Sequence, residues 1–302
     1  MSVDVFIEQK KPLKTTLNLT FLQNMCQALG LSYGVPNTAY ALSDYDGGQD
    51  IGDTTFVLYD PQKIGRGFSF WADESRHDCF VRLNNPATNE DITSFYGCIG
   101  YLCRELKTDH FLQDSNETHS VSQIGELAQN ITVWNASELL TFIKMDFSIV
   151  FGAMYPVAIE QDIIKRLLSL PESKAIDVFA SYLHEKQKND YYYAKASLFE
   201  DNETVITLGM YTVTEEVDSI FPLCPYVPFN YGVDFDYPVD EWIVTFVHEK
   251  NGDYCVAGRM DFQDFASAYG LPGKPRFDAK HVIIRLSGKE IMKLLEKRTN
   301  KK

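Results

Sequence analysis

The sequence has little of what marks secreted, disulfide-rich or zinc-binding proteins. Its six cysteines include no Cys-x-x-Cys pair and no dense framework of the kind that staples small secreted domains. We therefore expect reduced thiols, and Cys79, which alternates with Val81 and Leu83, has the pattern of a buried strand residue. The N-terminus has no basic segment leading into an apolar stretch, so we expect no signal peptide.

Long hydrophobic runs are also missing. The longest nearly apolar run, residues 147–159, contains Pro156 and is shorter than the ~20 residues that a helix needs to cross a bilayer. These absences predict a cytoplasmic protein that does not associate with membranes.

Positive charge is scarce. The chain has 28 Lys and Arg against 42 Asp and Glu, a formal net charge of −14. Because Lys and Arg supply most non-specific affinity for nucleic acid, we expect no nucleic-acid partner. The basic run at residues 289–302 complements the dipole of a C-terminal helix. An acidic surface attracts basic partners, so a protein partner is the expected kind.

What is present is enough for a folded core. Of 302 residues, 45% are apolar and 13% aromatic, at a chain length where one core begins to split into two. The pattern predicts an α+β fold, with hairpin-rich antiparallel sheets packed against a few amphipathic helices in two lobes. The polar stretch 107–122 is the best linker, which gives lobes 1–122 and 123–302; one continuous domain is the alternative.

Several elements can be placed individually. Residues 55–59, 68–72 and 79–83 are expected to form an antiparallel meander, followed by a helix capped at Thr88 or Asn89. Two short helices are expected at 122–129 and 137–144, and one buried strand at 147–155. Asn251-Gly252 predicts a hairpin turn.

Motifs for cofactors and metals are incomplete. Gly65-Arg66-Gly67 lacks the third glycine of a dinucleotide-binding loop and reads as a turn. His184-Glu185 and His248-Glu249 each lack the second histidine of a zinc-binding helix. We therefore predict no cofactor and no metal site.

Two clusters remain as candidate sites. Glu74, His77 and Asp78 bring acid and imidazole groups together in one hairpin connection, although a solvated hairpin tip is the favoured interpretation. In residues 222–241, prolines alternate with aromatic and acidic residues, and these rings either pack down as a lid or bind a partner. The candidate binding residues there are Tyr226, Phe229, Tyr231, Asp234, Asp236 and Tyr237.

The leading hypothesis from these observations is a non-enzymatic, cytosolic binding or interaction protein. The alternative is an enzyme with hydrolase-like chemistry, whose site is assembled from distant residues and uses Glu74, His77 and Asp78.

The opening Ser2-Val3-Asp4-Val5-Phe6-Ile7, the turn Ile64-Gly65-Arg66-Gly67-Phe68 and the overall length resemble an uncharacterised bacterial family of proteins of unknown function. The resemblance implies a bacterial cytosolic protein. It carries no activity that could be transferred to particular residues.

Overall fold

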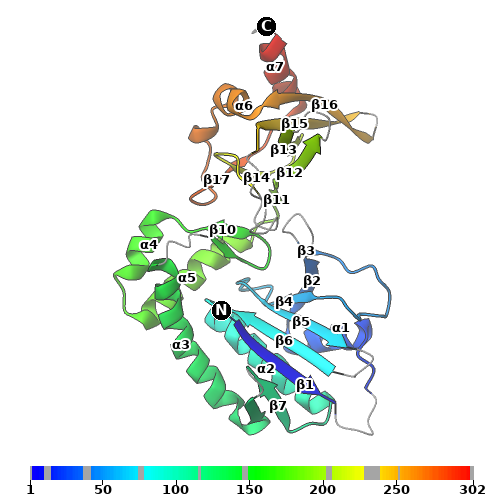
Figure 1. Cartoon of the computed structure of the whole chain (residues 1–302), viewed down its shortest axis with the longest axis vertical. Helices are drawn as coiled ribbons and strands as arrows, with labels where there is room; N and C mark the ends of the chain where they lie inside the picture. The colour runs from blue at the N-terminus through cyan, green and yellow to red at the C-terminus, as the bar shows by residue number, and fades with distance from the viewer. Residues whose placement is uncertain are drawn as a thin grey trace. The chain divides into compact units, whose positions relative to one another are not determined.

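The computed structural model describes residues 2–9, 15–36, 42–73, 78–114, 117–144, 149–201, 206–227, 239–250 and 252–299. The chain forms two compact units, residues 1–189 and 190–302 (Figure 1). Both contain helices and sheets in which most neighbouring strands are antiparallel, so the predicted α+β class is confirmed.

An eight-stranded sheet organises the first unit, in the order β3-β2-β4-β5-β6-β1-β7-β8. Every neighbouring pair in it is antiparallel. Its strands are β1 (Ser2–Glu8), β2 (Ser32–Pro36), β3 (Leu42–Ser43), β4 (Phe56–Tyr59), β5 (Phe68–Asp73), β6 (Asp78–Asn84), β7 (His110–Gln113) and β8 (Glu117–Ser120). The predicted meander is confirmed as β4, β5 and β6.

Five helices accompany this sheet among the described residues: α1 (Leu19–Leu29), α2 (Asn89–Glu105), α3 (Ile124–Lys144), α4 (Gln161–Leu168) and α5 (Glu172–Gln187). A 3-10 turn, η1 (Val121–Gln123), leads into α3, and a small hairpin joins β9 (Ile149–Phe151) to β10 (Pro156–Ala158). Helix α2 starts at a capping box in which the Thr88 side chain accepts from Asp91 N and the Asp91 carboxylate accepts from Thr88 N. Of the two predicted caps, Thr88 is the one used.

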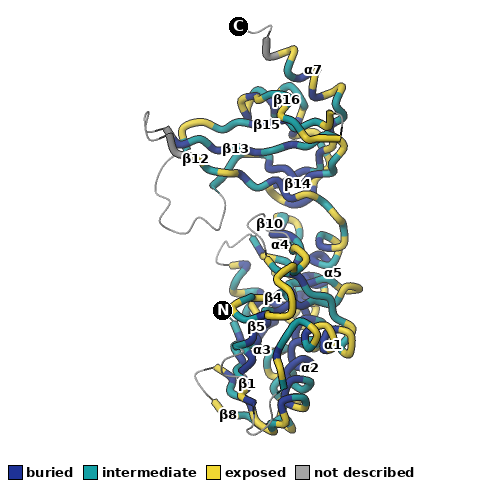
Figure 2. The backbone as a smooth tube through the Cα atoms, turned by 90° about the vertical axis from the view of Figure 1, so that its right-hand side faces the viewer, coloured by how far each residue is buried: buried dark blue, intermediate teal, exposed yellow. Residues whose placement is uncertain are grey.

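Strict alternation along β1 decides which side of the sheet is buried. Val3, Val5 and Ile7 are at most 2% exposed and join one core with the buried stripe of α2, whereas the residues between them are half-buried or exposed. Helices α1 and α2 lie on this inner face (Figures 1 and 2). The outer face is the side of the sheet directed away from α1 and α2.

The polar stretch 107–122 does not separate two lobes. It contains β7 and β8, which extend the sheet because Phe6 of β1 pairs with Leu112 of β7. Helix α3 then packs against α2 and α5, so the structure divides the chain after residue 189 instead of after residue 122.

Two further elements differ from the sequence-based prediction. Helix α3 is continuous where two short helices were expected, because Ile124, Leu127, Ile131 and Trp134 form one stripe against the core. Within residues 149–158 the expected single strand is the β9–β10 hairpin, and residues 145–148 lie outside the described part.

The second unit contains two smaller sheets, whose strands are labelled in Figure 1. One has the order β11-β14-β17 and the other β12-β13-β15-β16. Their strands are β11 (Tyr192–Tyr193), β12 (Ser197–Asp201), β13 (Ile206–Thr214), β14 (Ser219–Pro222), β15 (Glu241–Lys250), β16 (Asp253–Asp261) and β17 (His281–Ile284). Helices α6 (Phe262–Tyr269) and α7 (Gly288–Thr299) and the 3-10 turn η3 (Leu271–Gly273) complete it. The hairpin predicted around Gly252 is confirmed by the antiparallel β15–β16 pair, with Gly252 at φ 86°.

Candidate functional site

The outer face of the large sheet carries an apolar row that crosses four strands. Phe6 pairs in register with Leu112 of β7 and with Phe80 of β6, and Phe80 pairs with Trp71 of β5. Phe6 and Phe80 have ring centroids 4.9 Å apart, and Trp71 stacks on Phe80 at 5.1 Å with an interplanar angle of 1°. All four side chains are half-buried. The three rings and the Leu112 side chain next to them form one apolar surface.

An ion pair borders this row on one side. The Arg82 guanidinium, opposite Asp4 in register, donates from both Nε and Nη2 to the Asp4 carboxylate, with Nη2 to Oδ2 at 3.0 Å. Arg82 Cζ also lies 5.9 Å from the centroid of the Trp71 ring. Hydrogen bonding to Asp4 raises the pKa of Arg82. The guanidinium therefore lies over the Trp71 ring, and the ion pair adds no net charge to this side of the apolar row.

A row of carboxylates borders the apolar row on the other side. Asp78 at the start of β6 pairs in register with Glu8 of β1 and with Asp73 of β5. Like charges directly opposite one another destabilise a sheet by roughly 0.2–1 kcal/mol per pair. Three carboxylate side chains thus stand in register at this end of the outer face.

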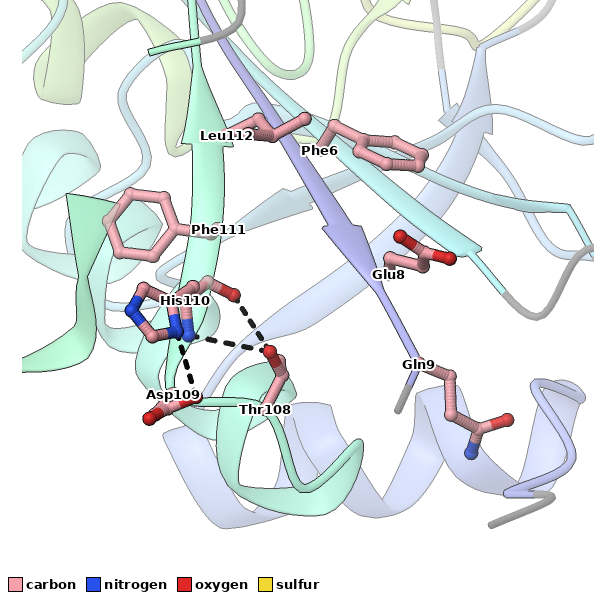
Figure 3. Close-up of a pocket in the computed structure, with 8 residues that line it drawn as sticks. All are labelled: Phe6, Glu8, Gln9, Thr108, Asp109, His110, Phe111 and Leu112. Atoms are coloured by element: carbon pink, nitrogen blue, oxygen red, sulfur yellow. Dashed lines mark hydrogen bonds and ion pairs between the residues drawn. The ribbon is translucent and has the colours of Figure 1, made fainter. Parts of the chain in front are cut away.

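Beyond Phe6, strands β1 and β7 separate and leave a cavity of 440 Å³ between them. Figure 3 shows its walls, with Glu8 and Gln9 on one side and Thr108, Asp109 and His110 on the other. The Thr108 hydroxyl donates to His110 O at 3.0 Å, and the His110 ring Nδ1 lies 2.8 Å from Asp109 Oδ1. One carboxylate residue thus lines the cavity from β1, Glu8, and one from the residue before β7, Asp109.

A second cavity of 300 Å³ shares Phe6 and Leu112 with the first and continues toward Trp71, Arg82 and Asp114. We call the two cavities together the β1–β7 groove. Its middle is apolar and one end is acidic, which suits an extended ligand with an apolar side chain next to positive charge.

The residues predicted from sequence fall into two places. Asp78 is 5% exposed and belongs to the carboxylate row, while Glu74 and His77 lie outside the described residues. Of the candidate binding residues in 222–241, Tyr226 is described. The others, Phe229, Tyr231, Asp234, Asp236 and Tyr237, lie outside the described part of the chain.

Tyr226 belongs to a buried polar network in the second unit. Its hydroxyl lies 2.8 Å from His281 Nε2 and 2.8 Å from the hydroxyl of Tyr193, and Tyr193 is 3.1 Å from the same imidazole nitrogen. His281 Nδ1 lies 2.8 and 3.0 Å from the two oxygens of Asp278, so Nδ1 carries the proton and Nε2 accepts from a phenol. Burial raises the pKa of Tyr193 well above its usual value.

Tyr193, His281 and Asp278 of this network are buried, and Tyr226 is half-buried. His281 is 2% exposed and Asp278 0%, and the Asp278 carboxylate also accepts from the backbone N–H groups of Lys280 and His281 at 2.8 Å. The tyrosine hydroxyls and the imidazole satisfy one another, as buried polar groups must. The arrangement orders the second unit, and Tyr226 is one of its structural members.

Sequence reasoning missed the outer-face rows. The available signal was the alternation Asp4, Phe6, Glu8 on the solvent side of β1, with a large aromatic residue at the centre. Among the described residues no group of three His, Cys, Asp or Glu side chains is placed to hold a metal ion. In the same residues no helix has the length and apolar character needed to cross a membrane.

Comparison with known proteins gives one match. The model of a family described as a domain of unknown function (DUF4299) matches residues 2–294, nearly the whole chain. No curated protein and no solved structure matches it.

Proposed function

This chain belongs to the DUF4299 family, a domain of unknown function, and we propose that it is a non-enzymatic, cytosolic bacterial protein that binds a basic segment of a partner protein in the β1–β7 groove. The observation that carries this proposal is the apolar row formed by Leu112, Phe6, Phe80 and Trp71 across four strands. Contiguous apolar surface of this kind marks interaction sites, and aromatic residues are enriched in them.

The carboxylates around the groove determine which kind of partner segment can bind. Glu8, Asp73 and Asp78 stand in one row beside the aromatic rings, and Asp109 lies across the groove from Glu8. A lysine or arginine placed in the groove meets the opposite charge of Glu8, while an apolar neighbour of that residue packs on Phe6. An acidic segment meets like charge and is excluded.

The test uses the full chain and synthetic peptides. One set alternates Lys or Arg with a single Leu, Phe or Trp, and a matched set carries Glu in place of every basic residue. Binding is measured by isothermal titration calorimetry at low and high salt. The basic set is expected to bind, more weakly as salt screens the carboxylates, and the acidic set is not.

Two variants locate the site. Trp71→Ser removes the end of the apolar row and Glu8→Lys reverses charge in the acidic row; each is expected to weaken binding by about tenfold, the loss of roughly one good contact. The matched controls, Tyr254→Ser and Glu296→Lys, change exposed residues of the second unit. Equal binding of both peptide sets, or equal losses in the controls, contradicts the proposal.

The enzymatic alternative with Glu74, His77 and Asp78 stays a prediction. It requires turnover of a hydrolase or transferase substrate that is lost in His77→Ala. Turnover that survives this change removes these residues from consideration.

A further inference from the structure

A second site in the first unit centres on Arg66, in the turn that leads from β4 into β5. Its backbone is fixed by the buried Asp91 carboxylate, which accepts from Arg66 N at 3.0 Å and from Gly67 N at 2.9 Å. Gly67 has φ 65°, and a Cβ there would lie 2.5 Å from Leu58 O. The turn therefore holds one conformation and aims the Arg66 side chain in one direction.

Three backbone carbonyls fix the guanidinium itself. Nε donates to Phe151 O at 2.9 Å, and Nη1 donates to Pro86 O at 2.9 Å and to Asn84 O at 3.3 Å. These bonds engage two of the three guanidinium nitrogens, Nε and Nη1. The two N–H groups of Nη2 have no partner among the described residues, so a planar and already oriented donor remains.

The charge of this guanidinium is only partly balanced. Burial lowers the pKa of Arg66 to about 10, with Asp91 acting in the opposite direction, so the group is still protonated at neutral pH. The Asp91 oxygens are committed to backbone N–H groups, and within the described part of the chain no carboxylate bonds to the guanidinium. A half-buried cation held by neutral carbonyls favours a bound anion.

Arg66 lines a cavity of 190 Å³ between the sheet and the β9–β10 hairpin. Ser69 and Asn84 add a hydroxyl and an amide to its wall, and much of the remainder is apolar, including Val57, Phe68 and Pro156. A compact inorganic ion would leave this apolar wall without contacts. The lining instead suits a ligand with one anionic end and a short apolar body.

We propose that this cavity binds a small organic carboxylate, with the carboxylate accepting from Arg66 Nη2 and the Ser69 hydroxyl and the apolar body packing on Val57 and Pro156. A purely structural role accounts for the bonds of Nε and Nη1 to three carbonyls. It does not account for the cavity that the Arg66 side chain lines, or for an Nη2 that has no partner among the described residues. The site is separate from the β1–β7 groove, so each proposal can fail without the other.

The experiment titrates the full chain with hexanoate, with uncharged hexanamide and with inorganic phosphate. Binding is followed by saturation-transfer NMR for the two organic probes and by calorimetry for all three. Hexanoate is expected to bind. Hexanamide, which lacks the negative charge, and phosphate, which lacks the apolar body, are expected to bind at least about tenfold more weakly.

Two variants separate ligand binding from folding. Arg66→Lys keeps a positive charge but loses the fork, and Val57→Phe fills the cavity while the Arg66 bonds stay intact. Both are expected to weaken hexanoate binding by about tenfold or more, with Arg104→Lys, an exposed arginine of α2, as the matched control. Equal binding of hexanoate and hexanamide, equal binding of hexanoate and phosphate, unaltered binding in Val57→Phe, or no binding of hexanoate overturns the proposal.

Discussion

Asp91 should be among the most sensitive positions of the first unit. Its carboxylate is 3% exposed and accepts three backbone hydrogen bonds, from Arg66 N and Thr88 N to Oδ2 at 3.0 Å and from Gly67 N to Oδ1 at 2.9 Å. It thus joins the β4–β5 turn to the first turn of α2. Removing the carboxylate leaves buried donors without acceptors.

The magnitude follows from the three bonds. An unsatisfied buried donor costs about 1–3 kcal/mol, and partial relaxation offsets part of the sum, so Asp91→Ala is expected to lose about 3–5 kcal/mol of unfolding free energy. Asp91→Asn keeps one oxygen but turns an amide N–H₂ toward a donor, and should lose about 2–3 kcal/mol. Both losses are large against a total of about 5–15 kcal/mol.

Urea unfolding monitored by circular dichroism and tryptophan fluorescence measures these losses. Asp162→Ala is the matched control, because Asp162 is also an acidic residue in the first turn of a helix, α4, but its side chain is 94% exposed. Its loss should stay below about 1 kcal/mol. If Asp91→Ala costs no more than Asp162→Ala, the stabilisation comes from the helix dipole and the reasoning from buried donors is wrong.

A double-mutant cycle adds a sharper test. A Cβ on Gly65 would lie 2.8 Å from Asp91 Oδ1 and closer still to Oδ2, so Gly65→Ala should displace this carboxylate. In the Asp91→Ala background the same substitution meets open space and should cost less. Strict additivity of the two changes would contradict the geometry.

Two further predictions concern the thiols and the last helix. Burial raises the pKa of Cys26 and Cys103 to about 12, and Cys79 and Cys98 are also buried. A thiol reagent should therefore modify only Cys224 and Cys255 in the folded protein. Fast modification of more than two thiols would refute this. Hydrogen bonds from the Ser287 backbone N–H and hydroxyl lower the pKa of Glu290 in the folded protein. The stability that the ionised Glu290 side chain contributes is therefore fully present above the ordinary pKa of 4.5, and it is lost as the pH falls through the lower folded-state pKa. The difference in Tm between wild type and Glu290→Gln should therefore shrink from pH 7 to pH 3, and a constant difference would exclude this cap as its source.

Local features could be predicted from the sequence because their partners are close in the chain. The Thr88 cap of α2 and the β15–β16 hairpin each depend on residues only a few positions apart. The burial of Cys79 followed from simple alternation, and the structure confirms it.

Features that depend on distant pairing could not be predicted in this way. Phe6 meets Leu112 across more than a hundred residues of sequence, so the polar stretch 107–122 looked like a linker and the apolar row was invisible. Continuity of α3 was missed for a related reason. Its middle, residues 130–136, is rich in asparagine and β-branched residues of low helix propensity, and its apolar stripe becomes decisive only against a core supplied by α2 and the sheet.

The placement of Tyr226 changes how the aromatic stretch 222–241 can be tested. Tyr226 N donates to the Tyr211 hydroxyl at 3.1 Å, and its own hydroxyl joins His281 and Tyr193 inside the second unit. Tyr226→Ser would remove one hydrogen-bond partner from both His281 and Tyr193, so it would lower stability whether or not the stretch binds anything. A loss of binding in that variant would therefore be ambiguous. Trp71 and Glu8, on the outer face of a separate unit, can be changed without opening a buried network, and they are the residues on which the binding proposal should be judged.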